Sequence, residues 1–161
     1  MKTVIEKGLH HVGYVVKNLD VALEALESSL GHLEYQKYSF KPMKAWCSGN
    51  KIDNYELKIA MINMGEGKTC IEIIEPVSEG YHMNFVKKDN IGGINHMCFA
   101  VDNGYDEIRK QFELEGANFV FESETEDDII GYRRCFYAKD KLGNVVEIKE
   151  TPYFRKEKCK R

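Results

Sequence analysis

The chain has 161 residues, of which 43% are hydrophobic, so its length and composition predict one globular domain with an ordinary core and exclude a multidomain assembly. Lys and Arg number 23 against 26 Asp and Glu, a net charge of −3 at pH 7, which argues against a nucleic-acid partner. No apolar run approaches the roughly 20 residues that a membrane-spanning helix needs, so we also expect no membrane span.

The first half of the chain begins with an apolar, strand-like segment at residues 8–18. Leu19–Leu30 then carries apolar residues at helical spacing, and Gly31 follows it in the manner of a glycine C-cap. Each later apolar run is short and therefore fits a strand. Three strands are expected, at Tyr35–Phe40, Leu57–Met64 and Thr69–Glu75, with a long loop at 41–55.

The second half follows the same order after a linker at 77–90, which contains a short helical pattern from Tyr81 to Lys88. A strand-like segment at 93–103 leads into a helix at Tyr105–Leu114, which Gly116 ends. Three further strands are expected, at Asn118–Phe121, Arg134–Ala138 and Val145–Glu150.

The two halves are related by an internal repeat. Residues 8–18 align without gaps on residues 93–103, and residues 69–76 resemble residues 144–152. Each half therefore predicts one βαβββ module, and two tandem modules are expected to share one α+β domain. The domain spans 1–161, and the modules lie at about 8–76 and 92–152.

The repeat places His11 at the same point of its module as His96. A lone histidine on an apolar strand is more often a core or surface residue than a ligand, but two at equivalent positions favour a shared site. Side chains alternate along a strand, so only one histidine of the His10–His11 doublet can face that site. The repeat selects His11, because the partner of His10 is Asn95.

A pair of glutamates repeats in the same way. Glu72 aligns with Glu147 and Glu75 with Glu150, and within each module the two glutamates face opposite sides of the strand. The repeat does not decide between the two pairs. Twofold packing of the modules would bring two imidazoles and two carboxylates into one cleft, and this set suits a divalent cation such as Co, Zn, Ni, Mn or Fe.

Four motifs of the sequence resemble the vicinal oxygen chelate superfamily of glyoxalases, bleomycin resistance proteins and dioxygenases. Within it, the sequence is most similar to the methylmalonyl-CoA epimerases. The resemblance implies a glyoxalase-like fold, in which the paired modules form a cupped mixed sheet around a metal ion. The motifs lie at 9–16, 70–76, 93–102 and 140–147. The metal ligands that the resemblance implies are His11, Glu72, His96 and Glu147.

The same resemblance implies a homodimeric isomerase, an epimerase that removes a proton α to the carbonyl of an acyl-CoA. One proton carrier would be Glu147 and the other a carboxylate in the loop before the third strand. This sequence has Asn54 at that position, so Asp53 beside it is either the second base or a solvated loop residue. Alternatives are a glyoxalase I-like lyase, an Fe(II) oxygenase, and a metal-free small-molecule (antibiotic) binding protein of the same fold.

Several other features allow two interpretations. Trp46, with Phe40 and Tyr55, either lines the substrate cleft or pins the long loop to the sheet. His32 and His82 fall outside the repeat and are expected at the surface. Five basic residues either contact CoA phosphates or are simply solvated, and these are Lys41, Lys44, Lys51, Arg133 and Arg134.

The ends of the chain and its cysteines favour a cytoplasmic protein. Residues 1–6 lack the apolar core of a secretory signal. None of the 5 cysteines belongs to a C-x-x-C pair, which argues against a disulfide framework and against a thiolate zinc site. The mostly basic residues after Pro152 are expected to form a frayed tail.

Overall fold

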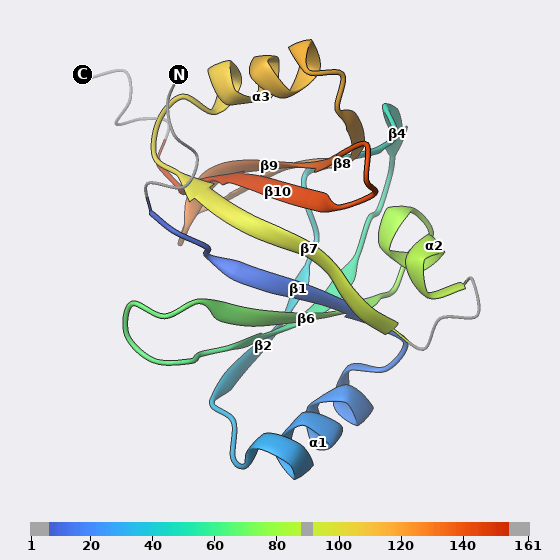
Figure 1. The fold of residues 1–161 in the computed structure, drawn as a ribbon, viewed down its shortest axis with the longest axis vertical. Helices are drawn as coiled ribbons and strands as arrows, with labels where there is room; N and C mark the ends of the chain where they lie inside the picture. Colours follow the sequence, from blue (N-terminus) through green and yellow to red (C-terminus); the bar gives the residue numbers. More distant parts are fainter. Residues whose placement is uncertain (1–6, 88–91, 155–161) are drawn as a thin grey trace.

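The computed structural model describes residues 7–87 and 92–154, which form one ten-stranded mixed sheet with three helices (Figure 1). None of these helices is long and apolar enough to cross a membrane. The helices are α1 (Leu19–Leu30), α2 (Tyr81–Lys87) and α3 (Tyr105–Leu114). The strands are β1 (His11–Val16), β2 (Tyr35–Phe40), β3 (Lys44–Cys47), β4 (Asn50–Ile52), β5 (Leu57–Ile62), β6 (Cys70–Pro76), β7 (Gly92–Val101), β8 (Asn118–Asp127), β9 (Gly131–Lys139) and β10 (Val145–Glu150).

The sheet is built from two halves of the same design. Its strand order is β2-β5-β6-β1-β7-β10-β9-β8-β3-β4, so the first eight strands form two matching sets that meet between β1 and β7. β1 is parallel to β6 and β7 is parallel to β10, whereas β1 and β7 are antiparallel neighbours. Two βαβββ units arranged about a pseudo-twofold axis have this topology, so the predicted α+β, glyoxalase-like fold is confirmed.

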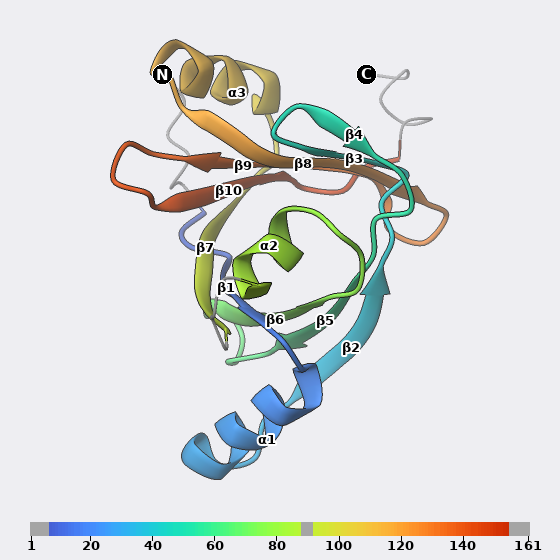
Figure 2. The same ribbon diagram turned by 90° about the vertical axis from the view of Figure 1, so that its right-hand side faces the viewer.

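The sheet curls into a cup, with α1 and α3 on its outer face and α2 inside the curl (Figures 1 and 2). Leu19 and Leu23 of α1 share a buried cluster with β5 and β6. Tyr105 and Ile108 of α3 pack in the same way on β9 and β10. The linker helix α2 instead contributes Val86 to the core inside the cup. The segment that joins the halves therefore fills one end of the cup.

The prediction of a loop at 41–55 is wrong, because this segment forms the hairpin of β3 and β4. The turn residues Ser48 (φ 48°) and Gly49 (φ 78°) both have positive φ, which matches the twist of a two-residue hairpin. β3 pairs with β8, with Trp46 opposite Glu122. A segment of the first half thereby extends the edge of the second half.

The strands β8 and β9 are longer than predicted. The second half of β8 has a polar sequence, which hides its strand character. Ser123 and Thr125 are nevertheless buried inside the cup, while Glu124 between them points outward and forms an ion pair with Lys44. Polar side chains on both faces of this strand therefore reflect a polar interior at one end of the cup.

Part of the predicted tail is bound to the sheet. The amide of Tyr153 donates to the carbonyl of Tyr132 at 3.0 Å, and the reverse bond measures 2.8 Å. Lys88, the predicted end of the linker helix, and residues 155–161 lie outside the described residues. The cysteines in the described part of the chain are free thiols.

Candidate metal centre

Two rows of residues cross the central strands and bring the repeated histidines and glutamates together. The central strands are β1 and β7, and β6 and β10 flank them. Each row holds a glutamate on a flanking strand, a small residue on the nearer central strand and a histidine on the other central strand. The twofold axis exchanges the rows, so each glutamate faces the histidine of the other half. The rows are Glu72, Gly13 and His96 on β6, β1 and β7, and Glu147, Cys98 and His11 on β10, β7 and β1.

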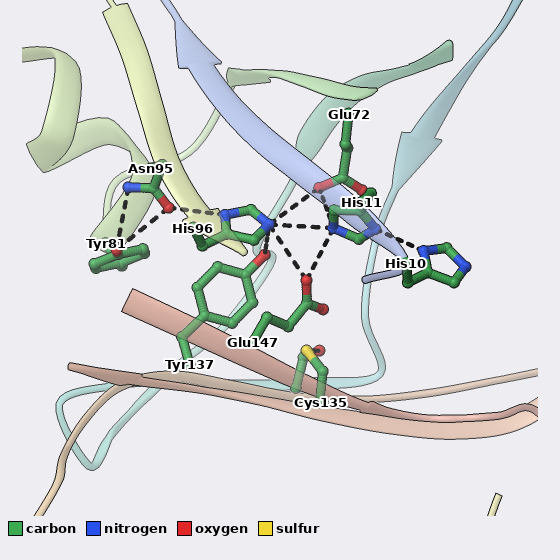
Figure 3. A network of polar contacts seen from close by, with 10 residues as sticks. His10, His11, Glu72, Tyr81, Asn95, His96, Cys135, Tyr137 and Glu147 are labelled. Atoms are coloured by element: carbon green, nitrogen blue, oxygen red, sulfur yellow. Dashed lines mark hydrogen bonds and ion pairs between the residues drawn. The ribbon is translucent and has the colours of Figure 1, made fainter. Parts of the chain in front are cut away.

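The four polar side chains of these rows converge inside the cup (Figure 3). Nε2 of His11 lies 3.2 Å from Nε2 of His96. Oε2 of Glu72 is 3.3 Å from Nε2 of His11 and 3.5 Å from that of His96. Oε2 of Glu147 is 3.1 Å and 3.3 Å from the same two nitrogens. The structure therefore brings together the four residues that the sequence suggested as ligands.

These separations fit coordination of one ion. Donor atoms about 2.1 Å from a divalent ion lie about 3.0 Å apart at octahedral angles and about 3.4 Å apart at tetrahedral angles. The five distances in the cluster range from 3.1 Å to 3.5 Å. Oε2 of Glu147 is also buried and lies against Nε2 of both histidines, as expected for an oxygen that shares an ion with them.

The cluster is shielded from water, since His96 is 1% exposed and Glu72 is 7% exposed. Burial opposes charge on His11, yet the carboxylates of Glu72 and Glu147 outweigh this effect and raise the pKa of His11 to about 10. Burial likewise favours neutral glutamates, but the histidines hold the pKa values of both carboxyl groups below their usual range. Two buried negative charges thus call for two positive charges, which a divalent cation supplies.

The residue before each histidine orients its ring. Nδ1 of His11 lies 2.9 Å from Nδ1 of His10, and burial lowers the pKa of His10 to about 4, so His10 is a neutral acceptor. Nδ1 of His96 donates to Oδ1 of Asn95 at 3.0 Å, and Nδ2 of Asn95 donates to the hydroxyl of Tyr81 at 3.1 Å. Because Nδ1 of each histidine faces its orienting partner, Nε2 is the nitrogen that faces the cluster and would bind an ion there. No role for these orienting residues was evident from the sequence, although the repeat aligns His10 with Asn95.

Two thiols near Glu147 do not change this donor set. Burial and the charge of Glu147 raise the pKa values of Cys98 and Cys135 well above that of a free thiol, which disfavours the thiolate form of both. A metal is bound by the thiolate and not by the thiol. The cluster therefore offers imidazole nitrogen and carboxylate oxygen, as the sequence analysis expected.

A cavity of about 780 Å³ opens onto the cluster, with His11, Glu72 and Glu147 at its base. This volume is typical of small-molecule sites. The wall that β5 and β6 provide is apolar and contains Leu57, Ile59, Met61 and Ile74. The wall that β8, β9 and β10 provide is polar and contains Ser123, Thr125, Arg133 and Lys149. The cluster is therefore open to a substrate with both polar and apolar parts.

The structure does not bring Asp53 to the cluster. Its side chain is 81% exposed, and its carboxylate forms an ion pair with Lys51 at 3.2 Å. It does not line the cavity either. Among the three aromatic candidates for the cleft wall, Phe40 lines the cavity, whereas Trp46 lies outside it and Tyr55 is buried in the core.

The five basic residues considered for CoA phosphates all form ion pairs with carboxylates of the chain. Because each charge is already matched, none of them is a ready-made phosphate site. The pairs are Lys41–Glu56, Lys44–Glu124, Lys51–Asp53, Arg133–Asp127 and Arg134 with both Asp106 and Glu150.

The prediction that His82 lies at the surface is wrong, because it is 0% exposed. The hydroxyl of Tyr55 lies 2.6 Å from Nδ1 of His82, whose ring packs against Phe121 and Tyr137. Burial lowers the pKa of His82 to about 3, so Nδ1 accepts this hydrogen bond. The prediction failed because α2 lies inside the cup. His32, in contrast, is exposed as expected.

Comparison with known protein families identifies the class to which this fold and site belong. The chain is a member of the glyoxalase/bleomycin resistance protein/dioxygenase superfamily, whose family model matches residues 10–136. This confirms the superfamily that the sequence motifs indicated. A search of curated proteins finds no match.

Solved structures similar to this chain include methylmalonyl-CoA epimerases. That of Mycobacterium tuberculosis is 21% identical with a TM-score of 0.63, over 98% of this chain and 96% of that one. The Streptomyces coelicolor epimerase in complex with 2-nitronate-propionyl-CoA is 16% identical with a TM-score of 0.57, over 90% and 97%. A hypothetical protein from Bacillus halodurans C-125 is 21% identical with a TM-score of 0.60, over 90% and 94%. At these identities the likeness shows a shared fold.

Proposed function

We propose that this protein is a divalent-metal-dependent isomerase, or a related lyase, that removes a proton α to a carbonyl group. The observation that carries the proposal is the twofold set of two imidazole nitrogens and two carboxylate oxygens at the base of the cavity. A divalent cation bound there would act as a Lewis acid and stabilise the negative charge that develops on the carbonyl oxygen in the transition state.

The two glutamates of the cluster are the candidate proton carriers. Glu147 opens onto the cavity, so its carboxylate can accept the α proton of a substrate bound there. Glu72 is its counterpart across the twofold axis and also opens onto the cavity. We assign the second proton transfer to Glu72 in place of Asp53, because Asp53 is exposed and ion-paired outside the cavity.

An acyl-CoA of the methylmalonyl type is the first substrate class to test. The similar structure of the Streptomyces coelicolor methylmalonyl-CoA epimerase is a complex with 2-nitronate-propionyl-CoA. This ligand supports a thioester with an acidic α proton as the substrate. A glyoxalase I-like lyase is the second candidate. Glu72 and Glu147 both line the cavity, so the same two carboxylates would carry its proton transfers.

Metal analysis tests the site first. We expect the dialysed wild-type protein to retain about one divalent ion per chain after exposure to Co, Zn, Ni, Mn or Fe, and His96→Ala to lose it. His32→Ala changes an exposed histidine outside the cluster and should retain the ion. A wild-type protein that binds none of these ions would contradict the proposal.

Proton exchange tests the chemistry. The metal-loaded protein is incubated with methylmalonyl-CoA in deuterated buffer, and deuterium at the α carbon is measured by mass spectrometry. We expect incorporation with the wild type and a decrease of at least about 100-fold with Glu147→Gln, since general-base catalysis contributes about 10²- to 10⁴-fold. Incorporation that is unchanged in Glu147→Gln would rule out Glu147 as the base.

A further inference from the structure

One cation that lines the cavity has no carboxylate partner among the residues that the structure describes. Lys41, Arg133 and Arg134 also line the cavity, but each forms an ion pair at 3.2 Å or less. Lys149 lines the same cavity and forms no such pair with any described residue. Its charge is therefore available to a molecule that enters.

Lys149 is placed close to the reacting groups. It follows Glu147 by two residues on β10, so the two side chains share one face of the strand, about 7 Å apart along it. Lys149 is half-buried and lines the same cavity as Glu147. A group held by Lys149 would lie beside a carbon from which Glu147 takes a proton.

The charges of the site favour an anion at this position. With a divalent cation bound, the two glutamates of the cluster are neutralised, and the ammonium group of Lys149 is left as an unmatched positive charge at the cavity wall. Such a charge in a partly enclosed cavity attracts and orients an anion. The opposite wall contributes Leu57, Ile59 and Met61, which suit an apolar substituent.

We propose that Lys149 binds an anionic group of the substrate, and that the cavity therefore takes small anions with an apolar substituent in preference to neutral carbonyl compounds. The proposal rests on the proposed function, because it places the reacting carbon beside the cluster. A carboxylate and a phosphate share the chemistry that a lysine recognises, and the two arginines of the polar wall, Arg133 and Arg134, already pair with carboxylates of the chain. We commit to a carboxylate.

The test compares probes that differ by one charge. Malonate carries two carboxylates, and malonamate has an amide in place of one of them. Binding of each probe, and of inorganic phosphate, to the metal-loaded protein is measured by calorimetry. The variants are Lys149→Met, the charge-retaining Lys149→Arg, and Lys139→Met as a control. Lys139 is exposed on the neighbouring strand β9 and lies outside the cavity.

We expect Lys149→Met to weaken malonate binding about tenfold and malonamate binding less than about threefold, as the loss of one charge–charge contact predicts. Lys149→Arg should restore part of the preference, and Lys139→Met should not change it. Equal losses for both probes, or no loss in a Lys149→Met protein that retains its metal and fold, would overturn the proposal. A loss confined to phosphate would overturn the choice of carboxylate.

The proposed function fails on a separate result, namely a wild-type protein that takes up no divalent ion. The protein could also bind metal and exchange the α proton while its preference for malonate over malonamate stays the same in Lys149→Met. That result would support the proposed function and overturn this inference.

Discussion

The imidazole of His96 lies directly against the backbone of Gly13 on the neighbouring strand. A Cβ atom added to Gly13 would come within 2.0–2.6 Å of three atoms of the ring. The missing side chain is therefore what allows His96 to lean across β1 toward the cluster. At the equivalent position of the other half the residue is Cys98, so the two halves differ in how closely their histidines approach the sheet.

We expect Gly13→Ala to weaken metal binding about 10- to 100-fold, because the methyl group would force the His96 ring away from its position. The dissociation constant is measured by competition with a chromogenic chelator. Gly93→Ala is the matched control, since an added Cβ at Gly93 meets no atom within 4 Å. Equal affinities of the two variants would contradict the role of this contact.

His96 is hydrogen-bonded to Asn95, and Asn95 is hydrogen-bonded to Tyr81. This chain of bonds predicts that Asn95 and Tyr81 both position the histidine. Asn95→Ala removes the acceptor of the Nδ1 proton and should weaken metal binding about 10- to 100-fold, as loss of an orienting partner usually does. Tyr81→Phe should have a smaller effect in the same direction. Asn84→Ala, at an exposed position of α2, should have none. The dissociation constant of the metal is the readout, and a normal value in Asn95→Ala would exclude the role.

Metal removal should destabilise the protein if the cluster holds an ion. At a free metal concentration about 1,000 times the dissociation constant, binding stabilises the native state by about 4 kcal/mol. Treatment with a chelator should then lower the Tm by roughly 8–16 °C for a chain of this length. Calorimetry measures the shift, and an unchanged Tm in the wild type would argue against the ion.

Glu72 and Glu75 lie on opposite faces of β6, so their substitution tests which face of the sheet binds the metal. Glu72→Ala should abolish the effect of the chelator on the Tm, because it removes a side chain of the cluster. Glu75→Ala should leave that effect intact, since Glu75 accepts from the amide of Leu19 and pairs with Lys58 on the outer face. The reverse result would show that the metal lies elsewhere.

The buried His82 predicts a dependence of stability on pH. Burial lowers its pKa from 6.5 to about 3 in the folded protein. Below pH 6.5 the unfolded chain takes up a proton at this position and the folded protein does not. The contribution of neutral His82 to the free energy of unfolding is therefore present above pH 6.5 and is lost as the pH falls toward 3, by up to about 1.4 kcal/mol per pH unit.

His82→Gln should consequently show a shallower loss of stability than the wild type between pH 6.5 and pH 4. Urea unfolding of the metal-free proteins at several pH values gives the comparison, so that metal release does not contribute. His32→Gln serves as the control, because His32 is exposed and outside the core. Parallel curves for His82→Gln and the wild type would mean that His82 is protonated in the folded state.

Much of the architecture could be predicted because the chain contains a repeat. Residues 8–18 and 93–103 carry the same pattern, so the two βαβββ units and the equivalence of His11 with His96 follow from residue order. The hairpin of β3 and β4 could not be predicted because its strands have only 4 and 3 residues, and because its partner β8 lies in the other half of the chain.

The amino-acid sequence by itself determined the repeat, the α+β class, and the candidate histidines and glutamates, because these depend on pattern and spacing along the chain. The pairing of the strands decided the rest. The register across β6, β1 and β7 places Glu72, and not Glu75, beside His96. The need for glycine at position 13 and the burial of His82 arise from contacts between distant segments. Such contacts leave no periodic signal in the sequence, so only the tertiary structure could reveal them.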